Sequence, residues 1–174
     1  MQSYRQKLKE FKTWAQIKSP QLIRPALNYT LGWLSPELLG TGFRMIEVSD
    51  FAMKANVPAV ASNLDANQEL HQGLIVNAAM ELSKTFINRH LTEVYYQIDS
   101  SEIKISKKQK WPEDLHLFLQ VKNVILDDFF SELQQKKKAQ LVLNIQLEIG
   151  NSKKADTVEL KLNCSAINML TSKA

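Results

Sequence analysis

Residues 67–81 bring together side chains that could carry out acid–base or nucleophilic chemistry. In this segment, NQELHQGLIVNAAME, Glu81 could serve as a general base or as a carboxylate nucleophile. Asn67 and His71 precede it and could hold a reacting group by hydrogen bonds. Gly73 falls at the expected start of a helix, where free backbone N–H groups and the helix dipole favour an oxyanion.

Each of these residues also has a purely structural interpretation. Glu81 could pair with Lys84 three residues further on, or lie at a hydrated boundary between subunits. Gly73 could simply allow close packing in the first helical turn. His71 could cap the helix start, and Asn67 could belong to a turn or act as an N-cap. The sequence alone leaves both interpretations open.

Most other chemistries lack their sequence signatures in this chain. It contains no GxSxG, GxxxxGK[ST], GxGxxG or HExxH motif, which are typical of serine hydrolases, P-loop enzymes, dinucleotide enzymes and zincins. The single cysteine, Cys164, excludes an intrachain disulfide and a cysteine-based zinc cluster, and no matched histidine motif accompanies it. The three histidines, His71, His90 and His116, are scattered and leave little for a metal site.

Composition and charge indicate one globular domain. The 174 residues are 44% hydrophobic and 23% charged, as in ordinary domains of this length. The net charge of +4 comes from the first 24 residues, so a nucleic-acid-binding body is not expected. No apolar run resembles a secretory signal or approaches the ~20 residues that span a bilayer, and cytoplasm is therefore the expected location.

Residues 1–34 are expected to form a helical extension ahead of a domain that covers residues 35–174. Within residues 4–18, apolar side chains recur every three or four positions with lysines between them, which is typical of an amphipathic helix. We expect this helix to cover the domain or a partner subunit, and docking on an anionic membrane surface is the alternative. Ser19 and Pro20 indicate the start of a second, shorter helix.

The middle of the chain predicts a hairpin followed by one long helix. Residues 43–48 and 51–57 alternate in polarity and are separated by Ser49 and Asp50, which favour a turn. Residues 70–90 then contain no proline and are apolar on nearly all sides, which is typical of a buried helix. The helix has one polar stripe, formed by Asn77, Glu81, Lys84 and Asn88.

The C-terminal half predicts four strands, at residues 95–105, 115–126, 139–149 and 157–169. Residues 127–138 could form a short helix. Strands that follow one another without intervening helices form antiparallel sheets, so the fold class is α+β. One helix that is apolar nearly all round must be wrapped by a curled sheet or covered by a second subunit.

This order of elements, with the segment from Asn67 to Glu81, resembles the hotdog fold of acyl-CoA thioesterases, in which an antiparallel sheet wraps a long helix. The most similar branches are the phenylacetate-pathway type and related hotdog domains. The resemblance covers residues 35–170 in architecture and 67–81 in motif. Two spacings depart from the family pattern: four residues separate Asn67 from His71 where six are usual, and Glu81 follows His71 by ten where nine are usual. One residue on a helix is a rotation of about 100°.

The resemblance implies hydrolysis of an acyl-CoA or acyl-carrier-protein thioester at a site between the subunits of a homodimer or tetramer. It implies Glu81 as the base or nucleophile and the Gly73 N–H as the oxyanion donor, with Asn67 and His71 as positioning groups. Asn77 and Leu74 would contact the substrate. No metal or organic cofactor is expected, because coenzyme A would enter as part of the substrate.

Two other functions are compatible with the same residues. A hydroxyacyl dehydratase on this fold needs a histidine facing an acidic residue, which His71 and Glu81 could supply, although the FPG-type segments of dehydratases are missing. A non-catalytic acyl-binding or scaffold protein is favoured by the two departures in spacing.

Overall fold

A computed structural model describes residues 36–91, 96–150 and 156–166 of the chain. The helical extension predicted for residues 1–34, including its alternative role at a membrane, lies outside these ranges. The last predicted residues of the final strand, 167–169, lie outside them as well.

Six strands, two α-helices and two short 3-10 helices make up the described residues. Along the chain they are η1 (Pro36–Leu38), β1 (Arg44–Val48), β2 (Ala52–Val57), η2 (Ala61–Asn63), α3 (Gln72–His90), β3 (Tyr96–Ser106), β4 (Leu115–Gln120), α4 (Asn123–Lys136), β5 (Lys138–Ile149) and β6 (Asp156–Ala166).

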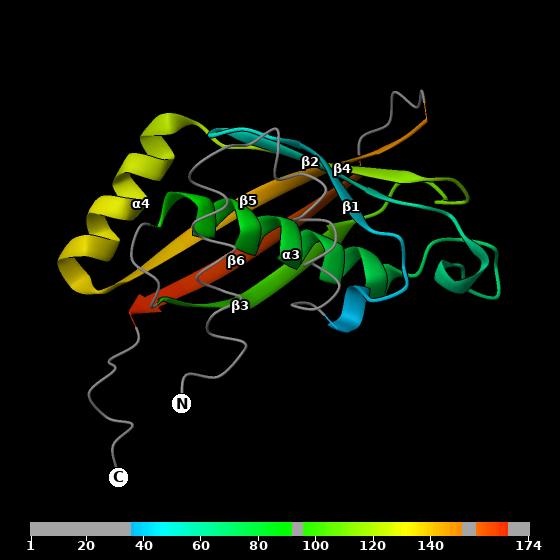
Figure 1. The fold of residues 1–174 in the computed structure, drawn as a ribbon, viewed down its shortest axis with the longest axis horizontal. Coiled ribbons are helices and arrows are strands. Elements are labelled where there is room, and N and C mark those ends of the chain that lie inside the picture. The colour runs from blue at the N-terminus through cyan, green and yellow to red at the C-terminus, as the bar shows by residue number, and fades with distance from the viewer. Residues whose placement is uncertain (1–35, 92–95, 151–155, 167–174) are drawn as a thin grey trace, which may run out of the picture.

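The strands form one antiparallel sheet in the order β1-β2-β4-β5-β6-β3. Among the described strands, β1 and β3 lie at the two edges, and the one partner of β3 is β6. Figure 1 shows α3 lying across one face of this sheet, with α4 at one end. Contacts of α3 with β2, β4, β6 and β3 extend over most of the width of the sheet. The predicted α+β class, with one long helix on an antiparallel sheet, is confirmed.

The core lies between α3 and the inner face of the sheet. Ile75, Leu82 and Phe86 recur on one side of α3 and are fully buried, as the helical period predicts. On the sheet, β5 alternates strictly, with buried residues such as Leu143 and Ile145 between exposed ones. The period of each element therefore sets which residues reach the core.

The predicted strand at residues 115–126 is wrong beyond Gln120, because α4 begins at Asn123. The alternation of β4 ends there, and the apolar residues Leu126, Phe129 and Leu133 then follow at helical spacing and are buried. Lys137 closes this helix in a left-handed conformation, with φ of 57°. The short helix predicted for residues 127–138 thus exists and starts four residues earlier.

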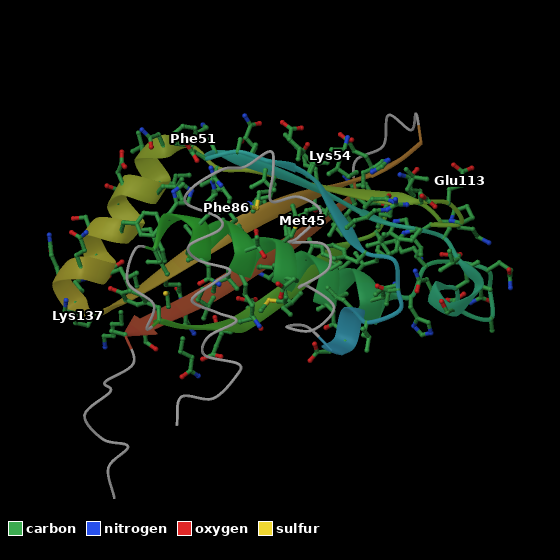
Figure 2. All side chains as sticks on the ribbon, viewed as in Figure 1. Met45, Phe51, Lys54, Phe86, Glu113 and Lys137 are labelled. Carbon is green, nitrogen blue, oxygen red and sulfur yellow. The ribbon has the colours of Figure 1, made fainter. Side chains whose placement is uncertain are left out.

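His90 lies where the end of α3 meets α4 and the β1–β2 turn. Its ring contacts Phe86 on α3 at 5.1 Å and Phe130 on α4 at 5.6 Å between centroids. Figure 2 shows Phe86 at the end of α3 that lies nearest to α4. The neighbouring Arg89 donates two hydrogen bonds to Oδ1 of Asp50, at 3.0 and 2.7 Å. Burial lowers the pKa of His90, and the backbone and charge of Asp50 oppose this shift.

We predict that His90 makes the stability of the fold depend on pH. The pKa of His90 is lower in the folded state than the ordinary value of 6.5. The contribution of neutral His90 to the free energy of unfolding is therefore complete above pH 6.5 and is lost as pH falls through the folded pKa. The free energy of unfolding, measured by urea denaturation, should fall from about pH 7 to about pH 5 in the native chain. The fall should be smaller in His90→Phe and unchanged in the exposed-site control His71→Gln. An equal fall in all three chains would contradict the prediction.

Candidate functional site

The first turn of α3 carries free backbone donors at an exposed position. Gly73 is the second residue of the helix, and His71 occupies the N-cap position without a capping side-chain hydrogen bond. The first intrahelical bond runs from the N–H of Ile75 to the carbonyl of His71, at 3.2 Å. Among the described residues, the N–H groups of Gln72, Gly73 and Leu74 therefore have no backbone acceptor. Such groups favour a bound oxyanion.

Gly73 is the first member of a series along the outer side of α3. Asn77 and Glu81 follow at intervals of four residues, and each step turns only about 40° around the helix. Gly73 and Asn77 are exposed, and a Cβ added at Gly73 would meet no heavy atom within 4 Å. Packing among the described residues therefore does not require glycine at this position.

The Glu81 carboxylate is buried, with 7% of the residue exposed. It lies at the border between the exposed side of α3 and the buried side. One turn further on, the fully buried Thr85 donates a hydrogen bond from its hydroxyl to Glu81 Oε1, at 3.4 Å. This hydrogen bond holds one carboxylate oxygen and so orients the group. Leu74, half-buried two turns before Glu81, lines the same flank of the helix.

Within one copy of the chain, the predicted site residues do not converge on one point. Eight residues separate Gly73 from Glu81, which is about 12 Å along the axis at a rise of about 1.5 Å per residue. His71 and Glu81 of one copy are about 15 Å apart along the axis by the same measure, so they do not face each other within that copy. Asn67 lies in the loop before the helix with an exposed side chain, and its backbone N–H donates to Asp65 Oδ1 at 2.7 Å.

The loop that precedes α3 is organised by Asn63, which is 2% exposed. Its Nδ2 donates to the carbonyls of Thr41, at 2.7 Å, and Pro58, at 2.8 Å. The backbone carbonyl of Asn63 accepts a hydrogen bond from the N–H of His71 at 3.0 Å. Asn63 thus holds the start of α3 through its backbone and two other segments through its side chain.

A second turn within this loop is held by Asp65. Its carboxylate accepts the N–H groups of Glu69, at 3.1 Å, and Asn67, at 2.7 Å. These hydrogen bonds lower the pKa of Asp65 below its ordinary range, because they favour the charged form. Gln68 adopts a left-handed conformation, with φ of 59°, to close the turn. The loop is therefore ordered by its own side chains before any ligand binds.

Sequence reasoning missed two residues of this site. Thr85 had a usable signal, because it follows Glu81 by four residues and must lie beside it on a helix. Asn63 had no such signal, since its acceptors come from other segments and nothing near it in the sequence marks it as buried.

The described residues contain no group of three or more His, Cys, Asp or Glu side chains that could hold a metal ion. Their helices also include none that is both long and apolar enough to cross a bilayer. Burial raises the pKa of Cys164 to about 11, and the thiol is the form present near neutral pH.

No protein-family model matches this chain, and no curated protein sequence matches it. Solved structures do. PA5026 from Pseudomonas aeruginosa, a protein of unknown function described as a probable thioesterase, gives a TM-score of 0.74 at 10% identity, covering 87% of this chain and 99% of its own. Thioesterase HI1161 from Haemophilus influenzae gives 0.64 at 16% identity, covering 87% and 94%. PaaI from the phenylacetic acid degradation operon of E. coli gives 0.59 at 14% identity, covering 86% and 97%.

These similarities confirm the hotdog fold expected from the sequence, with its antiparallel sheet and central helix. At such low identities they establish the fold and leave the activity to the site itself.

We predict that Asn63 stabilises the fold and Asn67 does not. Asn63→Ala would leave the carbonyls of Thr41 and Pro58 without their donor, which costs about 1–3 kcal/mol of unfolding free energy. Asn67→Ala removes an exposed side chain and should change this free energy by less than about 0.5 kcal/mol. Denaturant unfolding of both variants measures the difference, and equal values would show that Asn63 does not organise the loop.

Proposed function

We propose that this chain hydrolyses an acyl thioester, of coenzyme A or of an acyl carrier protein, with Glu81 as the catalytic carboxylate. The observation that carries the proposal is the buried Glu81 carboxylate, oriented by Thr85, on the same side of α3 as a free helix start. The hotdog fold, shared with thioesterases of known structure, supports it.

The reaction would use the two ends of this side of α3 for different tasks. The thioester carbonyl oxygen would accept a hydrogen bond from the Gly73 N–H, where negative charge developing on oxygen is stabilised. Glu81 would remove a proton from water as the water oxygen bonds to the carbonyl carbon. The C–S bond then breaks, the sulfur leaves as a thiol after taking up the proton, and the acid product remains. If Glu81 instead attacks directly, its oxygen bonds to the carbonyl carbon, the C–S bond breaks, and the thiolate leaves and takes a proton from solvent. Water then hydrolyses the acyl anhydride, which releases the acid product and restores the Glu81 carboxylate.

Because Gly73 and Glu81 of one copy are about 12 Å apart, they cannot both contact one carbonyl group. Two antiparallel copies of α3 related by a two-fold axis would place Gly73 of one copy opposite Glu81 of the other. We infer that the chain acts as a homodimer, or a tetramer of such pairs, with the site between subunits. The exposed edge strand β3, eleven residues long, offers the backbone groups through which two sheets can join.

Asn77, exposed midway between Gly73 and Glu81, and the half-buried Leu74 would contact the acyl part of the substrate. His71 and Asn67, exposed beside the helix start, would contact it near the thioester. No resident metal or organic cofactor takes part in this mechanism, since coenzyme A belongs to the substrate.

We predict that Gly73→Ala moves stability and activity in opposite directions. Alanine fits the space and raises the helix propensity, so unfolding free energy should rise by up to about 1 kcal/mol. The added methyl group would obstruct the approach of the carbonyl to the N–H, so kcat/KM should fall about tenfold or more. Denaturation and release of free thiol from a panel of acyl-CoA thioesters measure the two effects. Unchanged kcat/KM would remove Gly73 from the site.

We predict that Glu81→Gln abolishes turnover and leaves ligand affinity intact, because the amide keeps the shape but cannot accept a proton. Turnover that survives this change would contradict the role of Glu81. A native chain that binds acyl-CoA without hydrolysing any ester of the panel would instead be an acyl-binding protein, and the ten-residue spacing from His71 would be the physical reason.

The site between subunits can be tested by mixing Glu81→Gln with Gly73→Ala and refolding them together. Each mixed dimer would then contain one site with both native groups, and activity should rise to about a quarter of the native value. A site contained within one copy would give no increase above the average of the two variants.

A further inference from the structure

The fully buried carboxylate of Asp156 holds the loop between β3 and β4. Asp156 is the first residue of β6 and has 0% of its surface exposed. Its Oδ2 accepts the indole N–H of Trp111 at 2.7 Å, and its Oδ1 accepts the backbone N–H of Lys108 at 2.6 Å. A buried carboxylate is costly unless such charge-assisted hydrogen bonds satisfy it. The arrangement therefore fixes the position of Trp111, which is itself fully buried.

Trp111 in turn is bonded to the residue just before the N-cap of α3. Its backbone carbonyl accepts the N–H of Leu70 at 2.8 Å. The next N–H along the chain, that of His71, is bonded to Asn63. The three N–H groups that follow, those of Gln72, Gly73 and Leu74, have no backbone acceptor in the part of the chain that the structure describes. The start of α3 is thus held by Asn63 on one side and by the Trp111 carbonyl on the other.

A further contact strengthens this connection. Lys107 forms an ion pair with Glu69, and its ammonium group lies 4.6 Å from the centroid of the Trp111 ring. The hydrogen bond from Lys107 lowers the pKa of Glu69. Because Glu69 directly precedes Leu70, the β3–β4 loop contacts the segment before α3 through a side chain as well as through the backbone. Figure 2 shows Glu113, in the β3–β4 loop, at the end of the molecule opposite α4.

We propose that Asp156 and Trp111 are positioning residues for the oxyanion-binding N–H groups at the start of α3. An oxyanion donor must lie within about 0.5 Å of its productive position, and a shift of about 1 Å can reduce the rate a hundredfold. The chain of contacts from Asp156 through Trp111 to Leu70 sets that position relative to the sheet. This inference rests on the proposed thioesterase function, in which those N–H groups contact the substrate.

Two variants break the connection and keep the backbone carbonyl of Trp111. Asp156→Asn has the same shape, but its NH₂ group must face one of two N–H donors, which repel it. Trp111→Phe keeps most of the buried ring and removes the indole N–H. In both variants we expect kcat for thioester hydrolysis to fall about tenfold or more with little change in KM. The amide NMR resonances of Gln72, Gly73 and Leu74 should shift as well.

The matched control is Leu133→Ala, which removes a buried side chain from α4, at the other end of the molecule. It lowers stability from a different element of the fold, so its kcat, measured below its unfolding temperature, should equal the native value. Unchanged kcat in Asp156→Asn and Trp111→Phe, or an equal loss in Leu133→Ala, would overturn the positioning role and leave the thioesterase proposal standing. A native chain without turnover on any thioester would overturn the proposed function and this inference with it.

Discussion

The burial of one side of α3 against the sheet is the constraint on which the rest of the structure depends. Ile75, Leu82 and Phe86 are fully buried on that side, and the sheet supplies the facing apolar residues from several strands. The orientation of the helix about its own axis is fixed as a result. Because that orientation is fixed, Gly73 and Asn77 are exposed, and Glu81 is buried where the exposed side of the helix meets the buried side.

The same constraint explains why the Glu81 carboxylate lies between the exposed side and the buried side of α3. Glu81 is close enough to the core to be buried and to receive the hydroxyl of Thr85, yet it follows two exposed members of its series. The hydroxyl of the buried Thr85 therefore sets the orientation of this carboxylate from the buried side of the helix. Under the proposed function, this preorganisation would prepare Glu81 for its catalytic role.

Features that follow a local period could be predicted from the sequence. The hairpin β1–β2, the long helix α3 and the alternation of β5 were all predicted because their patterns repeat every two residues or every three to four. The start of α4 was missed because the apolar residues after β4 continue its hydrophobic character while the period changes.

Contacts that join distant segments could not be predicted in this way. Trp111 and Asp156 are 45 residues apart, and Asn63 and Thr41 are 22 apart, so no periodicity connects them. The candidate residues on α3 were visible in the sequence as a motif. The residues that hold the start of that helix were not, because a buried polar side chain is recognisable only when its partners are known.

The place of β3 in the sheet has a consequence for how the chain folds. β3 lies at an edge, and its only partner in the sheet is β6, the last described strand of the chain. Within the described sheet, residues 96–106 therefore have no partner strand until residues 156–166 have been synthesised. Strands that are far apart in the sequence pair slowly, and an unpaired strand can associate with other chains before its partner strand is available. The synthesis of residues 156–166 thus sets the earliest time at which the described sheet can be completed.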